Sequence, residues 1–107
     1  MNSERLKLLE EYLKNDPNDP FNLYAIATEY RSSSPEKALQ YYHDLLTRHA
    51  DYLPTYYQAA TLLADMDKTT EAEEIFKQGI NLAIAQNNAL TLRELRSAYN
   101  ELLFEDE

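Results

Sequence analysis

The chain contains no cysteine and no tryptophan, and it has only one glycine, Gly79, and four prolines among its 107 residues. Without cysteine it forms no disulfide and no thiolate metal site, and this composition fits a reducing compartment. So few turn-forming residues argue against an all-β fold, which needs a turn roughly every 8 to 12 residues. Hydrophobic residues make up 44% of the sequence. We therefore expect a folded chain built from helices.

Basic side chains are also few, with ten lysines and arginines against nineteen acidic residues and a net charge of −9. Such a surface repels nucleic acid and anionic membranes. No apolar run approaches the roughly 18 to 20 residues of a membrane span. The first fifteen residues have no apolar run of signal-peptide length. These absences favour a cytoplasmic protein that binds neither nucleic acid nor membrane.

What the chain does contain is an internal repeat of 34 residues. A fixed period in this range indicates a stacked-repeat architecture, which usually works through its surface and has no catalytic pocket. The pairs that recur at this spacing are Pro20 and Pro54, Ala38 and Ala72, and Tyr42 and Phe76.

Hydrophobic spacing and turn residues predict an all-α fold of about six helices. Asp19 and Ser34 are expected to cap the helices that open at Pro20 and Pro35. Thr70 and Glu73 have the spacing of a capping box, and residues 105–107 are expected to fray. The predicted helices cover residues 3–15, 20–32, 35–49, 54–66, 70–85 and 88–104.

The two copies of this repeat resemble tetratricopeptide repeats, whose pattern of large and small residues extends over 34 positions. Ala27 and Ala60 stand where the family has glycine, and tryptophan is missing. The matching residues are Leu23, Ile26, Ala27, Tyr30, Ala38 and Tyr42 in the first copy, and Tyr56, Ala59, Ala60, Leu63, Ala72 and Phe76 in the second.

This resemblance implies a single domain over residues 1–107, coiled into a right-handed superhelix of helical hairpins. Its parts would be a half repeat over 3–19, repeats over 20–52 and 53–86, and a capping helix over 88–104. Arg96 falls in a slot that the family fills with a small residue. We expect it to block a further helix, so that the array ends there and the chain is complete.

The resemblance also implies a concave groove, lined by the first helix of each hairpin, that binds a segment of another protein. Tyrosine suits such a face because it offers a large area and a polar tip. The alternative is that Tyr24 and Tyr57 only pack against neighbouring helices. The predicted groove residues are Phe21, Tyr24, Thr28, Arg31, Tyr57, Gln58, Thr61 and Asp65.

Some tetratricopeptide domains hold a carboxylate with lysine and asparagine in this groove. Here Tyr24, Thr28 and Gln58 occupy those places, so no such clamp is expected. A neutral or weakly apolar segment fits better, with a basic residue near Asp65. The predicted function is a non-catalytic adaptor. The alternative is a scaffold or homo-oligomerisation module, such as a homodimer, that uses the groove or exposed tyrosines such as Tyr41 and Tyr52.

No metal or cofactor is expected. His43 and His49 are six residues apart and do not share a helix face as an i, i+4 pair would. Asp65 and Asp67 begin no calcium loop, because the required glycine is missing and Phe76 stands at the twelfth position. The sequence also has no nucleophile–base pairing and no phosphate-binding glycine loop, which argues against an enzyme.

Overall fold

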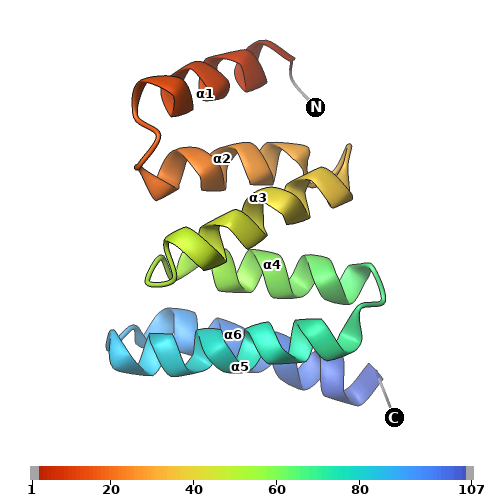
Figure 1. Ribbon diagram of the computed structural model, residues 1–107. Helices are drawn as coiled ribbons and strands as arrows, with labels where there is room; N and C mark the ends of the chain where they lie inside the picture. Colours follow the sequence, from red (N-terminus) through yellow and green to blue (C-terminus); the bar gives the residue numbers. More distant parts are fainter. Residues whose placement is uncertain (1–2, 106–107) are drawn as a thin grey trace. The chain divides into compact units, whose positions relative to one another are not determined.

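The computed structural model describes residues 3–105, which form six α-helices and no strand (Figure 1). Residues up to Thr55 form one compact unit, here unit 1, and residues from Tyr56 form a second, unit 2. The predicted all-α helical repeat fold is confirmed. The helices are α1 Ser3–Asn15, α2 Pro20–Tyr30, α3 Pro35–Arg48, α4 Pro54–Asp65, α5 Thr69–Ala85 and α6 Ala89–Glu105.

Helix ends differ from the predicted ends by one or two residues. Helix α2 ends at Tyr30 and not at residue 32, because the Tyr30 carbonyl accepts the amides of both Ser33 and Ser34 and closes the turn. Helices α3 and α4 each end one residue early, at Arg48 and Asp65. Helix α6 continues to Glu105, so the predicted fraying is wrong at this residue, and residues 106–107 lie outside the described part.

In unit 1, the start of α2 is held by two side chains. The Asp19 carboxylate accepts the Phe21 amide at 3.0 Å, which confirms the predicted cap. The Asn22 side-chain amide donates to the carbonyls of Tyr12 (3.3 Å) and Asp16 (3.2 Å) at the end of α1. These bonds join the Asp16–Asp19 turn to both helices that it connects.

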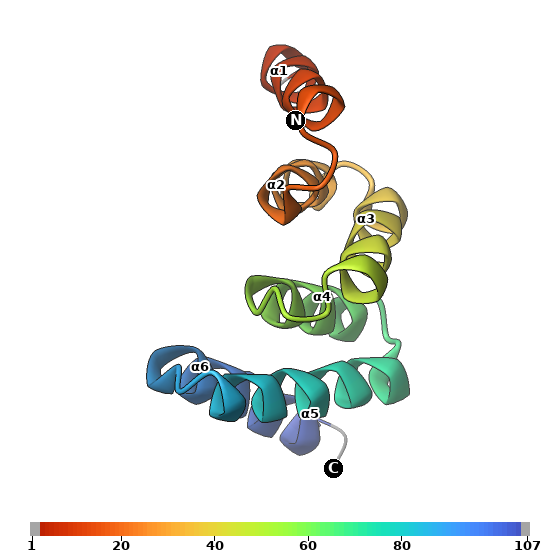
Figure 2. The ribbon, with the colours of Figure 1, turned by 60° about the vertical axis from the view of Figure 1, so that its left-hand side comes forward.

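Unit 1 is packed around the hairpin of α2 and α3, which lie against each other, with α1 alongside α2 (Figures 1 and 2). Ala27 on α2 and Ala38 on α3 are fully buried. Such small side chains allow two helix backbones to approach closely. The larger buried side chains of the hairpin are Leu23, Ile26, Tyr30, Leu39, Tyr42 and Leu45.

Two turns near the ends of α4 and α5 share one geometry. Asp67 (φ 60°) and Asn87 (φ 56°) adopt the left-handed conformation, in which asparagine and aspartate are the least strained residues after glycine. The following amides, of Lys68 and Asn88, donate to the carbonyls of Leu63 and Ala83 at 2.9 Å. This is the Schellman pattern that terminates many helices.

The predicted capping box at the start of α5 is wrong. Helix α5 begins at Thr69, its N-cap is Lys68, and no side chain caps it. The Glu73 carboxylate instead accepts the Tyr99 hydroxyl at 2.7 Å and pairs with Lys77 at 3.5 Å. Glu73 therefore links α5 to α6. At α3, Ser34 occupies the predicted N-cap position but makes no side-chain capping bond.

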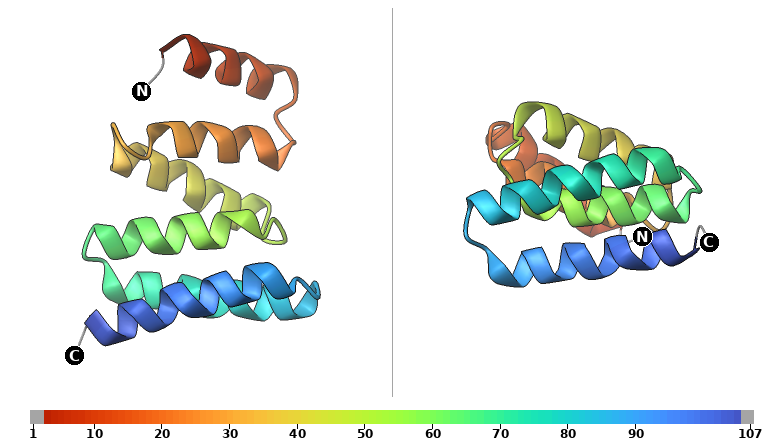
Figure 3. Two further views of the ribbon diagram at one scale, coloured as in Figure 1. Left: turned by 180° about the vertical axis from the view of Figure 1, so that it is seen from behind. Right: turned by 90° about the horizontal axis from the view of Figure 1, so that it is seen from below.

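In unit 2, α5 contacts both α4 and α6 (Figure 3). A β-carbon placed on Gly79 would lie 2.7 Å from the Tyr56 β-carbon and 3.3 Å from a Leu95 methyl group. The Phe76 and Tyr99 rings stack with their centroids 5.7 Å apart. Glycine is thus required at this position because a side chain on α4 occupies the space. This agrees with the prediction that Gly79 marks a close contact between helices.

We expect Gly79→Ala to lower the free energy of unfolding by about 1–3 kcal/mol, since the added methyl group meets a β-carbon that is fixed to its backbone. This loss outweighs the gain of about 1 kcal/mol that alanine brings to a helix interior. Urea denaturation measures it. The control is Asn81→Ala on the exposed side of α5, where stability should stay equal or rise. Stabilisation by Gly79→Ala would contradict the packing.

The Tyr99–Glu73 hydrogen bond makes stability depend on pH at both extremes. It raises the pKa of Tyr99 to about 12 and lowers the pKa of Glu73 below its ordinary value of 4.5. The Tyr99 contribution is complete below pH 10 and is lost as the pH rises toward 12. The Glu73 contribution is present above 4.5 and is lost as the pH falls further.

We therefore expect Tyr99→Phe to lower the free energy of unfolding at neutral pH. In acid, the free energies of unfolding of the variant and the wild type should differ less. Urea denaturation over a pH series measures this difference. The control is Tyr12→Phe, because the Tyr12 ring is exposed. NMR titration of labelled tyrosine should show the Tyr99 ring ionising with a pKa of about 12, and that pKa should fall toward 10 in Glu73→Gln. An unchanged signal would disprove the coupling.

Candidate functional site

In unit 1, Tyr24 is half-buried between two other tyrosine rings. Its ring centroid lies 6.4 Å from that of Tyr42 and 5.8 Å from that of Tyr52, which meets it edge-on. Part of Tyr24 therefore packs, as the alternative interpretation held, while the rest remains accessible. Tyr41 and Tyr52, predicted to be exposed, are half-buried; Tyr41 stacks on Tyr30 at 5.8 Å.

Thr28 lies one helical turn after Tyr24 and is exposed. Its hydroxyl group shares a hydrogen bond of 3.0 Å with the hydroxyl of Tyr42, whose ring is fully buried. Burial raises the pKa of Tyr42, while the bond to Thr28 and the nearby Arg31 act in the opposite direction. The Tyr42 hydroxyl is consequently neutral near pH 7, and Thr28 presents a hydroxyl group that is held in place.

The remaining predicted residues of unit 1 lie at the two ends of α2. Phe21 is in the first turn and 56% of its surface is exposed. Arg31 directly follows the helix and is half-buried. An exposed phenylalanine at one end and a guanidinium at the other leave the face of α2 apolar at its start and polar at its end.

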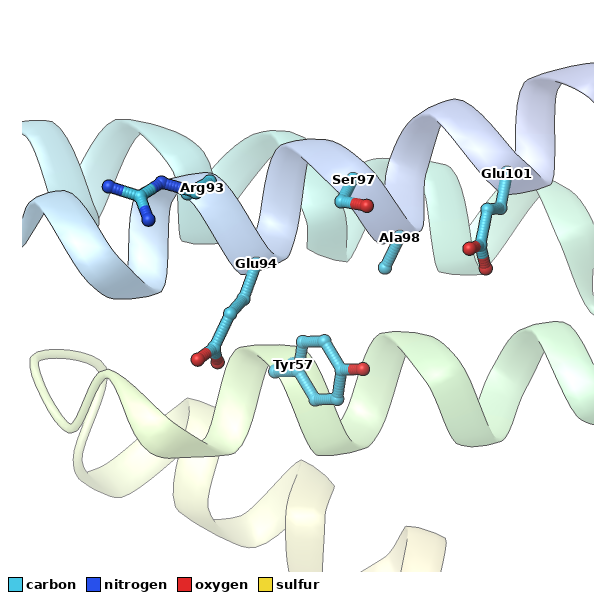
Figure 4. Close-up of a pocket in the computed structure, with 6 residues that line it drawn as sticks. All are labelled: Tyr57, Arg93, Glu94, Ser97, Ala98 and Glu101. Atoms are coloured by element: carbon cyan, nitrogen blue, oxygen red, sulfur yellow. The ribbon is translucent and has the colours of Figure 1, made fainter.

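In unit 2, Tyr57 lines a cavity of about 300 Å³ between α4 and α6 (Figure 4). Tyr57 itself is half-buried. Ala98 points from α6 toward the Tyr57 ring, and Glu94 extends from α6 toward α4, whereas the guanidinium of Arg93 points away from the ring. The other lining residues are Ser97 and Glu101.

A second cavity of about 110 Å³ adjoins the first and shares Tyr57, Ala98 and Glu101 with it. The predicted groove residues Thr61 and Asp65 line this smaller space. The Thr61 hydroxyl donates to the Tyr57 carbonyl at 2.8 Å, so its proton is turned toward its own helix. Predicted Gln58 is half-buried and lines neither cavity.

The sequence prediction placed no groove residue on α6, which it interpreted only as a cap. The structure makes α6 one wall of both cavities. The missed signal was the repeat register itself. Arg93 follows Leu92 just as Tyr57 follows Tyr56, and Ser97 then corresponds to Thr61. Arg96 is exposed on α6, which agrees with the predicted polar outer face.

Other potential sites carry little chemistry. Within residues 3–105, no three histidine or carboxylate side chains are grouped so that they could hold a metal ion. In the same range, no helix combines the length and the apolar character that crossing a bilayer requires.

Comparison with known proteins identifies the architecture. A tetratricopeptide repeat domain protein from Salinibacter ruber, solved in solution, is 33% identical over 81% of this chain and 89% of its own, with a TM-score of 0.76. A crystal structure of a tetratricopeptide repeat domain protein from the same organism is 32% identical over 78% of this chain and 96% of its own, with a TM-score of 0.75. The chain belongs to the tetratricopeptide repeat family.

A protein from Bordetella parapertussis shares the fold at lower identity. It is 17% identical over 99% of this chain and 92% of its own, with a TM-score of 0.83. Neither family models nor curated proteins gave a match to the chain. The fold is a helical repeat of a kind that commonly mediates protein interaction and is generally non-catalytic.

Proposed function

We propose that the chain is a non-catalytic, cytoplasmic adaptor that binds a segment of a partner protein along the groove-facing positions of its repeats. The observation that carries this proposal is Tyr57, which lies at a predicted groove position and lines an open cavity instead of the core. In unit 1, Tyr24 and Thr28 offer an aromatic surface and a hydroxyl group at the corresponding positions.

The chemistry of these positions supports binding by surface complementarity. Tyrosine side chains have few rotatable bonds, so ordering them on binding costs little entropy. Each of the two surfaces is small, and we expect an affinity of roughly micromolar. A segment bound here would contact rings that the neighbouring helices already hold in place.

We expect Tyr57→Ala to weaken binding of a selected peptide by about tenfold, or about 1.4 kcal/mol, because the ring forms a cavity wall. Peptides selected from a displayed random library against the whole chain supply the probe, and titration followed by NMR gives the dissociation constant. Tyr12→Ala is the control, since Tyr12 lies exposed on α1. Binding that leaves the signals of Tyr24, Thr28, Tyr57 and Thr61 unshifted would remove the groove assignment.

Self-association is a second candidate function, favoured by apolar side chains on α1. Leu8 is 47% exposed and Tyr12 is 49% exposed, one turn apart on the same helix face. An exposed apolar pair of this kind can pack against a second copy.

If α1 mediates self-association, the weight-average mass should rise across a concentration series in sedimentation experiments. Leu8→Ser should abolish the rise, because it removes half of the exposed pair. Leu90→Ser on α6, where Leu90 is 61% exposed, is the matched control. A monomer at every concentration would end this candidate.

A further inference from the structure

The cavities between α4 and α6 are lined by an excess of carboxylates. Glu94 and Glu101 line the larger cavity, and Asp65, Glu101 and Glu105 line the smaller one. Arg93 is the basic residue among the lining residues, and its guanidinium points away from Tyr57. The space in front of the tyrosine ring therefore lies in a negative field.

Glu94 and Glu101 are available to a ligand. Within residues 3–105, neither forms an ion pair, and both are exposed. They lie on the same wall of the larger cavity, on either side of Ala98. Two carboxylates and an aromatic ring that line the same cavity are complementary to a cation with an apolar stem.

We propose that this space receives an arginine or lysine side chain of the partner segment; the inference rests on the proposed function. The stem would pack against Tyr57 and Ala98, and the charged head would meet the carboxylates of Glu94 and Glu101. Charge-assisted hydrogen bonds and contact of the cation with the ring face both favour this occupant. The cavity of about 300 Å³ is at the lower limit for ligand sites, which suits one side chain better than a cofactor.

The opposite occupant is disfavoured by the same charges. A partner carboxylate would meet Glu94 and Glu101 in the larger cavity and Asp65 in the adjoining one, and like charges repel. The net charge of −9 also steers basic segments toward the chain and acidic ones away. Specificity for a positive segment thus arises from attraction and from repulsion of the alternative.

Three capped pentapeptides test the proposal, identical except for a central arginine, citrulline or glutamate. Citrulline keeps the shape of arginine and removes its charge. NMR titration of the whole chain should show saturable shifts at Tyr57, Glu94, Ala98 and Glu101 with the arginine peptide. The citrulline peptide should bind about tenfold more weakly, and the glutamate peptide should cause no shift at these residues. Equal binding of the arginine and citrulline peptides would overturn the proposal.

A pair of double variants separates local contact from overall charge. Glu94→Gln with Glu101→Gln should weaken the arginine peptide about tenfold. Glu71→Gln with Glu74→Gln removes the same net charge from α5, outside both cavities, and should leave binding nearly unchanged. Equal weakening in both variants would assign the effect to the general field and overturn the site.

Other outcomes identify a different occupant. Shifts at the same residues with spermidine but not with the arginine peptide would assign the site to a small cation and overturn the proposal. Concentration-dependent shifts without peptide would assign it to a second copy. Library peptides that shift Tyr57 but contain no enriched basic residue would overturn this inference and leave the adaptor function standing. A library that yields no binder would overturn both.

Discussion

Close approach of helices at small residues is the constraint on which each unit depends. Gly79 lets α5 come so near to α4 that a single methyl group would meet the Tyr56 β-carbon. Ala27 and Ala38 are fully buried in the hairpin of unit 1. Because the backbones are close, the larger side chains beside these positions fill the remaining space, and interiors at this density tolerate no added volume.

The same packing decides which side chains are left for binding. Helix α4 directs Tyr56 into the core toward Gly79, and the next residue, Tyr57, then faces the cavity beside α6. On α2, Tyr24 packs against two neighbouring rings and is otherwise exposed to solvent. Under the proposed function, aromatic groups that the helices hold at the surface can contact a partner without a large loss of entropy.

The carboxylates of unit 2 differ in whether they bond to other side chains. Glu73 on α5 is engaged by Tyr99 and Lys77 and links the last two helices. Glu94 and Glu101 on α6 form no ion pair within residues 3–105 and line the cavity. Under the proposed binding of a basic side chain, these carboxylates beside an aromatic ring favour positive charge over negative charge.

The sequence by itself determined the six helices, the repeat, the small residues at the contacts and the positions of Tyr24 and Tyr57, because these follow from local periodicity and a fixed spacing. It could not show that Glu73 would bond Tyr99 rather than cap α5. The repeat register did carry the signal that α6 forms a cavity wall, although the prediction did not use it. The bond between Glu73 and Tyr99 depends on which side chains meet where α5 and α6 pack against each other. Only the tertiary structure brings such groups together, since their contacts arise from packing and not from local preference.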